Sequence, residues 1–140
     1  KSLIYFFAIF NLLFSLTFIT MPFKILLVED NLPILENTTE ILELSDYKVY
    51  GACNGKDGLD MALKQNPDLI LCDVQMPVMD GYHLLENIRK SPSLAHSRFV
   101  FFTASSEKKD IQKGMQMGAD DYIVKPFTAE ALLDKLKKLL

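Results

Sequence analysis

The sequence has little of several residue types that mark particular protein classes. Its 140 residues include no tryptophan, two cysteines, two histidines, six glycines and six prolines. Glycine and proline are too few for a collagen-like or low-complexity chain. Cys53 and Cys72 form no CxxC pair, which excludes a disulfide framework and favours a reducing compartment. His83 and His96 lack metal-ligand spacing with each other or with a cysteine.

The chain also lacks an excess of positive charge. Fifteen basic and 18 acidic residues give a net charge of −3 and a pI of about 5.3. Because nucleic-acid binding needs a basic footprint, we expect no direct contact with nucleic acid. The hydrophobic fraction of 49% and the charged fraction of 24% exclude an intrinsically disordered chain, and the length fits one domain.

The first twenty residues contain no acid, glycine, proline or valine, but they hold five of the ten phenylalanines and one charge, Lys1. Residues 1–20 therefore form a hydrophobic leader that is distinct from residues 21–140. The leader is long enough for a marginal membrane anchor, but it lacks the basic region and cleavage site of a secretory signal. Upstream sequence before a natural start at Met21, a remnant of a longer parent, and a packed accessory helix are the alternatives. An ordered leader helix is expected to cover its apolar surface against another molecule.

Short, nearly continuous apolar runs recur through residues 21–140, with helical patterns between them. Continuous runs are typical of strands buried on both faces of a parallel sheet. Five alternations of strand and helix predict an α/β fold with helices on both faces of that sheet. The predicted strands are 24–28, 48–52 (an edge strand), 69–72, 99–102 and 122–124, and the predicted helices are 32–45, 56–65, 81–90, 107–117 and 128–139.

Each of the four central strand runs ends in a polar residue. Glu29 and Asp30 follow the first, and Asp73, Thr103 and Lys125 follow the others. Because ligands of open parallel sheets bind at the carboxyl ends of strands, we expect these side chains to meet at one edge. Two carboxylates about 5 Å apart repel by roughly 3 kcal/mol at an effective dielectric near 20, so the group needs positive charge.

The lysine supplies part of this charge, and a hard divalent cation would supply the rest. Mg²⁺ fits, because it takes oxygen ligands and is typically held by one or two carboxylates. Asp73 would then be available as a carboxylate nucleophile. Helix capping is the structural alternative for any single acid, since Asp30 or Asn31 could cap helix 32–45. The same pattern at all four strands favours a functional site.

Four motifs include these strand ends and the turns that follow them. They are ILLVEDN (25–31), DLILCDVQMPVMDGYHLL (68–85), FFTAS (101–105) and GADDYIVKPF (118–127). With them, residues 23–127 resemble the receiver domain of two-component response regulators and are similar to the single-domain chemotaxis response regulator. The resemblance implies a flavodoxin-like, doubly wound, five-stranded parallel sheet in the order 2-1-3-4-5 with five surrounding helices.

The resemblance implies a phosphoacceptor and a metal site. Asp73 would accept the phosphoryl group. Mg²⁺, or alternatively Mn²⁺, would be bound by Asp30, by Asp73, by the backbone carbonyl of Gln75 and, directly or through water, by Glu29.

Further roles follow from the same resemblance. Thr103 and the backbone amide of Ala104 would contact the phosphoryl oxygens, and Lys125 would form an ion pair with them. Pro126 matches a proline that follows a cis peptide bond in the family. Thr103 and Tyr122 would form the switch, in which the tyrosine ring moves inward after phosphorylation.

The implied function is a signalling switch and not an enzyme that turns over a substrate. A sensor histidine kinase or a histidine phosphotransfer protein would donate the phosphoryl group. The activity of the domain itself would be limited to its own phosphorylation and dephosphorylation at Asp73. The face formed by 107–117, 122–124 and 128–139 would then change its affinity for a downstream protein or an output domain. A cytoplasmic location is implied, with a tether to the inner membrane only if the leader is an anchor.

Three alternatives remain beside this function. The chain could be the receiver part of a hybrid histidine kinase, or an interaction module that works without phosphorylation. An aspartyl phosphatase or dehalogenase is disfavoured, because Gln75 stands where that class needs a second aspartate. Gln75 and Ser105 occupy positions that tune the phosphoryl lifetime in this family, and their effect here does not follow from the sequence.

Overall fold

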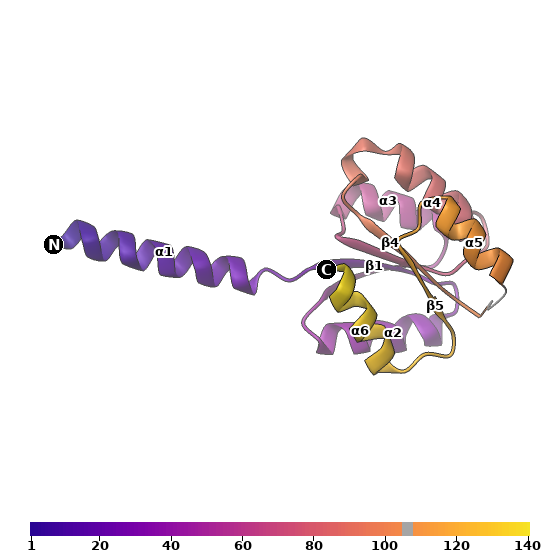
Figure 1. The fold of residues 1–140 in the computed structure, drawn as a ribbon, viewed down its shortest axis with the longest axis horizontal. Coiled ribbons are helices and arrows are strands. Elements are labelled where there is room, and N and C mark those ends of the chain that lie inside the picture. Colours follow the sequence, from indigo (N-terminus) through magenta and orange to yellow (C-terminus); the bar gives the residue numbers. More distant parts are fainter. Residues whose placement is uncertain (105–107) are drawn as a thin grey trace.

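The strands form one parallel sheet, as predicted. The structure is a computed structural model that describes residues 1–104 and 108–140, with the side chains of 16–20 outside the description. In this part of the chain the sheet has five strands in the order β2-β1-β3-β4-β5 (Figure 1). This order confirms the flavodoxin-like fold, and β2 lies at an edge as expected. The strands are β1 (Lys24–Val28), β2 (Lys48–Ala52), β3 (Leu69–Cys72), β4 (Arg98–Thr103) and β5 (Asp121–Val124).

Helices cover both faces of the sheet. Figure 1 shows α3, α4 and α5 on one face and α2 and α6 on the other. The predicted start of the fourth helix, residue 107, lies outside the described residues. The helices are α2 (Leu32–Leu44), α3 (Gly55–Gln65), α4 (Gly81–Lys90), α5 (Lys108–Gln116) and α6 (Ala129–Leu139), with a short 3-10 helix at Pro92–Leu94.

The continuous apolar strands follow from this double covering. Leu26 and Val28 of β1 belong to the hydrophobic cluster beneath α3 and α4, whereas Ile25 and Leu27 belong to the cluster beneath α2 and α6. All four side chains are fully buried. Since successive side chains of a strand point to opposite faces, both sets must be apolar. This packing fixes the strands, so the residues that follow them are held at the carboxyl edge of the sheet.

Helix caps settle one alternative that the sequence left open. The side chain of Asn31, and not that of Asp30, accepts a hydrogen bond from the Ile34 amide at 3.1 Å and caps α2. Pro33 fits the first turn, where no amide hydrogen is needed. The capping explanation therefore does not account for Asp30.

Helix α1 (Ser2–Thr20) projects away from the sheet (Figure 1). The large apolar side chains at its described positions are more than half exposed, among them Leu3, Phe6, Phe10 and Phe14. The described side chains of α1 thus do not pack on the sheet domain, and the backbone at the C-cap residue Met21 is extended. What residues 1–20 are in the protein stays open among the alternatives given above. Among the residues that the structure describes, we find no helix with the length and hydropathy needed to cross a bilayer.

Candidate functional site

The predicted site residues lie together at the carboxyl edge of the sheet. The register pairs Val28 with Cys72, so the residues that follow them, Glu29 and Asp73, are neighbours. The Asp73 amide donates to the Val28 carbonyl at 3.1 Å. Thr103 ends β4, and its carbonyl accepts from the Lys125 amide at 2.8 Å. Parallel pairing thus extends one residue past each strand and brings these side chains into one pocket.

Lys125 is the centre of the charge arrangement. Its ammonium lies 2.9 Å from Glu29 Oε2 and 3.1 Å from Asp73 Oδ2. It also lies 4.5 Å from the centre of the Phe102 ring, within range of a cation–π contact. The side chains of Lys125 and Asp73 are each 14% exposed and that of Glu29 is 1% exposed. One partly buried cation is therefore shared by two carboxylates.

The carboxylates of Glu29, Asp30 and Asp73 form a compact cluster. One oxygen from each lies within 4.8 Å of the others. Glu29 is buried and Asp30 is exposed, so the cluster opens to solvent on one side. Three hard oxygen donors at this separation match the ligand preference of Mg²⁺, which also keeps several waters. The residues present therefore fit the implied metal.

Burial disfavours the ionised form of Glu29 in the cluster. Desolvation raises the pKa of its carboxyl above the usual value, and the negative charge of Asp73 raises it further. The hydrogen bond and the charge of Lys125 oppose this increase, as does the hydrogen bond from the Asn31 amide. Since burial is the largest cause, the ionised form of Glu29 is less favourable in the fold than in water.

This raised pKa predicts a pH dependence of stability. The folded state holds the Glu29 proton more tightly than the unfolded state, so its contribution is complete below the unfolded pKa of about 4.5 and is lost as pH rises through the folded pKa. Without metal, Glu29→Gln should become more stable than the wild type as pH rises toward about 7, by roughly 1.4 kcal/mol for each pKa unit of the shift. Urea unfolding across this range measures the difference.

The exposed Glu40 on α2 provides the control for this comparison. Glu40→Gln should leave the difference from wild type nearly constant with pH. A constant difference for Glu29→Gln would show that burial of Glu29 does not govern the charge balance of the pocket.

The remaining predicted residues lie in or just after β3, β4 and β5. Thr103 is 4% exposed and Tyr122 is 8% exposed, with its ring centre 6.2 Å from that of Phe101. Ala104 is exposed directly after β4, and Gln75 is exposed two residues after Asp73. The Lys125–Pro126 peptide is cis. Ser105 lies outside the described residues.

Two contacts to Asp73 were not expected from the sequence. The Val74 amide donates to Asp73 Oδ1 at 2.7 Å, and the Cys72 thiol donates to the Asp73 carbonyl at 3.0 Å. Burial and the nearby acids raise the pKa of that thiol, which therefore stays protonated. The sequence at positions 72–74 did not predict the Val74 contact, since any residue except proline offers a backbone amide. It did not predict the thiol contact either.

A pocket of about 520 Å³ adjoins the acidic cluster. It lies between α2 and the segment after β5, and Lys125 and Ala104 belong to its lining. Its other walls are mostly apolar and are formed by Pro33, Ile34, Asn37, Thr38, Ile41, Pro126 and Phe127.

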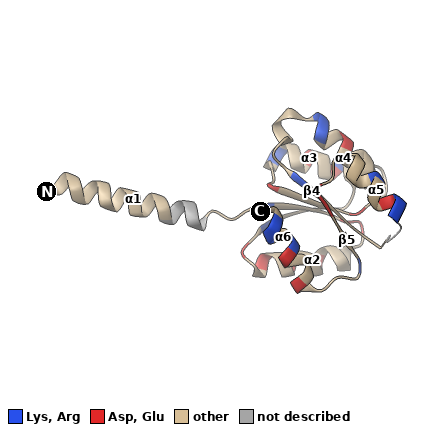
Figure 2. Ribbon diagram, in the orientation of Figure 1, with Lys and Arg blue, Asp and Glu red and all other residues tan. Residues whose placement is uncertain are grey.

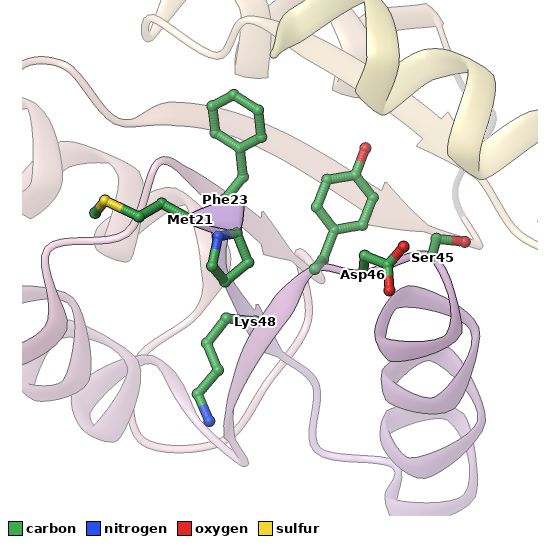
Figure 3. Close-up of a pocket in the computed structure, with 7 residues that line it drawn as sticks. Met21, Phe23, Ser45, Asp46 and Lys48 are labelled. Carbon is green, nitrogen blue, oxygen red and sulfur yellow. The ribbon is translucent and has the colours of Figure 1, made fainter. Parts of the chain in front are cut away.

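A second pocket, of about 670 Å³, lies at the opposite edge of the sheet, where β1 and β2 begin. It is lined by residues 21–23 and 45–48 (Figure 3). It is remote from the carboxyl edge, so the acidic cluster and not the larger cavity marks the candidate site.

The fold and the site together define a class: a doubly wound α/β domain whose carboxyl edge holds an acidic cluster bridged by a lysine. Residues 25–137 match the response regulator receiver domain family. The chain belongs to this family, a signalling domain of two-component systems. Receiver domains bind Mg²⁺ at an acidic pocket and interact with histidine kinases and phosphotransfer proteins.

Solved structures agree with this assignment. The chemotaxis protein CheY4 of Vibrio cholerae is 31% identical with a TM-score of 0.82, and the match covers 86% of this chain and 100% of that one. A CheY-like receiver domain protein from Methanospirillum hungatei is 32% identical with a TM-score of 0.79, covering 85% of this chain and 94% of that one.

Two curated relatives are longer than this chain. Proteins named "Probable transcriptional regulator ycf29" are 38% identical in Porphyra purpurea and 36% identical in Pyropia yezoensis, over 120 residues each. The matches cover 86% of this chain but 57% and 54% of those proteins. The chain thus spans little more than half the length of these relatives.

Proposed function

We propose that residues 21–140 form a phosphoacceptor switch that receives a phosphoryl group on Asp73. The observation that carries the proposal is the position of Lys125, whose ammonium lies 3.1 Å from Asp73 Oδ2 and 2.9 Å from Glu29 Oε2. A lysine at this distance neutralises charge where phosphoryl oxygens would gather. Phosphoryl transfer depends mainly on such positioning and charge stabilisation.

Asp73 is the nucleophile of the proposed reaction. The Val74 amide holds one oxygen of its carboxylate and Lys125 holds the other, so the group is oriented before the donor arrives. A carboxylate oxygen forms a bond to phosphorus while the phosphorus–nitrogen bond of a phosphohistidine breaks. The released imidazole nitrogen takes up a proton, and an acyl phosphate remains on Asp73. Hydrolysis by water restores the carboxylate.

Glu29, Asp30, Asp73 and the Gln75 carbonyl would hold Mg²⁺ or Mn²⁺. The bound cation would balance the negative charge of the phosphoryl oxygens. Lys125 neutralises the same charge from the β5 side, and Thr103 and the Ala104 amide donate hydrogen bonds to those oxygens. The cluster geometry and the raised pKa of Glu29 support a cation requirement.

The switch runs from Thr103 to Tyr122. Movement of Thr103 toward a phosphoryl oxygen would vacate space at the end of β4 that the Tyr122 ring fills. The ring already contacts Phe101 of β4, with 6.2 Å between centres. Because Tyr122 belongs to β5, this change would alter the surface of α5, β5 and α6 and its affinity for a partner, by biasing an existing equilibrium.

The donor is a sensor histidine kinase or a histidine phosphotransfer protein. The apolar pocket between α2 and Phe127 supports this choice, because it adjoins Lys125 and can receive a partner's apolar side chains while a phosphohistidine reaches Asp73. The output is a downstream protein or an output domain, as the longer relatives named as regulators suggest. The domain acts in the cytoplasm, with residues 1–20 as a separate leader.

Uptake of phosphate from acetyl phosphate tests the proposal. Incubation of the 140-residue chain with acetyl phosphate and Mg²⁺ should add one phosphoryl group, detected by intact-mass spectrometry. The adduct should be stable in acid, labile in base and located on the peptide that contains Asp73, because it is an acyl phosphate. EDTA should prevent its formation. Absence of uptake with Mg²⁺, or uptake on a serine or histidine, would refute the proposal.

A further inference from the structure

The loop between β3 and α4 carries the Gln75 carbonyl, and its two ends are fixed by local bonds. The Gly81 amide donates to the Val74 carbonyl at 2.8 Å and closes the base of the loop. The side chain of Asp80 caps α4. These bonds hold the ends of the loop but none of residues 75–79. The position of the Gln75 carbonyl therefore depends on contacts that the loop makes with the rest of the domain.

Within the part of the chain that the structure describes, the backbone of residues 75–79 has one hydrogen bond to a segment outside the loop. The Gly55 amide, at the start of α3, donates to the Met79 carbonyl at 3.1 Å. The half-buried side chains of Met76 and Met79 pack against the hydrophobic cluster beneath α3 and α4. Neither residues 75–79 nor residues 52–55 include Lys, Arg, Asp or Glu, so both stretches are tan in Figure 2. The loop is thus attached through backbone and apolar contacts and not through ion pairs.

Met79 lies too close to Gly55 for a side chain at that position. A Cβ atom on residue 55 would overlap the Met79 carbonyl oxygen and would lie 2.8 Å from Met79 Cβ. Gly55 begins α3 directly after the cap residue Asn54, and its φ lies outside the left-handed region that favours glycine. Alanine is otherwise preferred to glycine in a helix. The contact with the loop, and not the geometry of the helix, therefore accounts for this glycine.

The loop is held in a strained conformation. Val78 has a φ of 68°, and the Met79 amide donates to the Pro77 carbonyl at 2.7 Å, which defines a tight three-residue turn. A β-branched residue adopts this φ only where its surroundings enforce it. The Val78 side chain is 81% exposed, so the enforcing contacts belong to its neighbours Met76 and Met79. Loss of the contact between Met79 and Gly55 would therefore let the loop relax.

The segment that carries Gly55 also contacts the acidic side of the pocket. The Ala52 carbonyl, at the end of β2, accepts from the Glu29 amide at 3.0 Å. The side chain of Asn54 caps α3 and so fixes the short turn between Ala52 and Gly55. We call residues 52–55 the bridge segment. It joins the backbone of Glu29 on one side of the pocket to the loop after β3 on the other.

We propose that Gly55 is a positioning residue for the cation pocket. Through the Met79 backbone it fixes the loop after β3, and with it the place of the Gln75 carbonyl relative to the carboxylates on the other side of the pocket. The inference rests on the proposed cation site, because Gly55 acts only through the loop. Groups that orient metal ligands from outside the ligand set typically change metal affinity by roughly 10–100-fold when they are altered.

Mn²⁺ binding to the full 140-residue chain, measured by electron paramagnetic resonance, tests this proposal. Gly55→Ala should raise the dissociation constant by roughly tenfold or more, because the added methyl group displaces the Met79 carbonyl. Gly51→Ala adds a methyl group whose nearest neighbour would be Leu35 Cδ1 at 3.6 Å, and it should keep the affinity of the wild type. Leu94→Ala removes a fully buried side chain before β4, at the opposite edge of the sheet. It should lower the midpoint of urea unfolding and leave Mn²⁺ affinity unchanged.

Hydrogen exchange of the wild type provides a second readout that needs no substitution. If the bridge segment is coupled to the cation, Mg²⁺ should slow exchange of the Gly55 amide several-fold, because binding and the local contact stabilise each other. The Asn66 amide, which donates to the Ala62 carbonyl at the other end of α3, should exchange at the same rate with and without Mg²⁺. If Gly55→Ala does not fold, this comparison decides alone.

The outcomes separate this inference from the proposed function. Loss of Mn²⁺ binding in Asp73→Asn together with wild-type affinity in Gly55→Ala would overturn the positioning role and keep the cation site. Wild-type affinity in Asp73→Asn would overturn both. An equal loss of affinity in Leu94→Ala and Gly55→Ala, or an equal effect of Mg²⁺ on the Gly55 and Asn66 amides, would assign the change to overall stability and overturn the role of Gly55.

Discussion

Asp73→Asn should show no detectable phosphoryl uptake from acetyl phosphate and Mg²⁺. The substitution keeps the size of the side chain and its hydrogen bond from the Val74 amide, 2.7 Å long in the wild type. It removes the anionic nucleophile, because an amide oxygen carries no negative charge and an acyl phosphate cannot form on it. It also removes one of the two partners of Lys125. Intact-mass spectrometry and release of acetate both measure the loss.

Asp134→Asn provides the control for this variant. Asp134 is an acid on α6, away from the carboxyl edge of the sheet. Phosphoryl uptake by the Asp134→Asn variant should therefore equal that of the wild type. The folding of Asp73→Asn is checked by circular dichroism, and its unfolding midpoint should be no lower than that of the wild type, since one acid of a crowded cluster is neutralised. Undiminished uptake by a folded Asp73→Asn would place the phosphoacceptor elsewhere.

Gly81→Ala should lower the free energy of unfolding by about 3 kcal/mol. A Cβ atom at this position would overlap the backbone carbonyl oxygen of Asp73, and it would lie 3.0 Å from both Phe101 Cε1 and Val74 Cα. Two of these three neighbours are backbone atoms, which cannot rotate away. The turn that follows β3 must therefore shift, and Asp73 shifts with it. Urea unfolding should show the loss, and phosphoryl uptake should fall in parallel.

Gly51→Ala is the matched control, because it adds the same methyl group at a position in β2, away from Asp73. The three atoms nearest to a Cβ atom there would all belong to the Leu35 side chain, and the closest, Cδ1, would lie 3.6 Å away, an ordinary van der Waals contact. Its unfolding free energy should change by no more than about 0.5 kcal/mol. Equal stability of Gly81→Ala and Gly51→Ala would contradict the close packing of Gly81 against the strand that carries Asp73.

The fold was predictable because the sheet is covered on both faces. That covering requires β1 to be apolar at its four fully buried positions, Ile25 to Val28, and such runs stand out in a sequence. Strand boundaries differed by one residue, as at Arg98 and Asp121, where the strand begins with a partly exposed or charged side chain. Helix α3 begins at Gly55, one residue early, because Asn54 caps it.

The composition of the site was predictable from the strand ends, but its internal arrangement was not. Glu29 and Asp30 are consecutive acids, and nothing in the sequence distinguishes their environments. In the structure Glu29 is 1% exposed, whereas Asp30 is exposed to solvent. Which acids Lys125 contacts depends on rotamers and on packing against Phe102. The direction of α1 was likewise not predictable, since the apolar pattern of residues 1–20 is the same whether the helix packs on the sheet domain or projects from it.

The ammonium of Lys125 couples the two acids of the pocket energetically. It lies within 3.1 Å of both Glu29 and Asp73, so the removal of one acid changes the interaction of Lys125 with the other. The contribution of each contact to stability therefore cannot be assigned separately. The pKa of Glu29 consequently depends on the charges of Lys125 and Asp73 as well as on its own burial. Substitutions at these three positions are expected to be strongly non-additive, and the energetics of the pocket are defined only by double-mutant cycles that include all three.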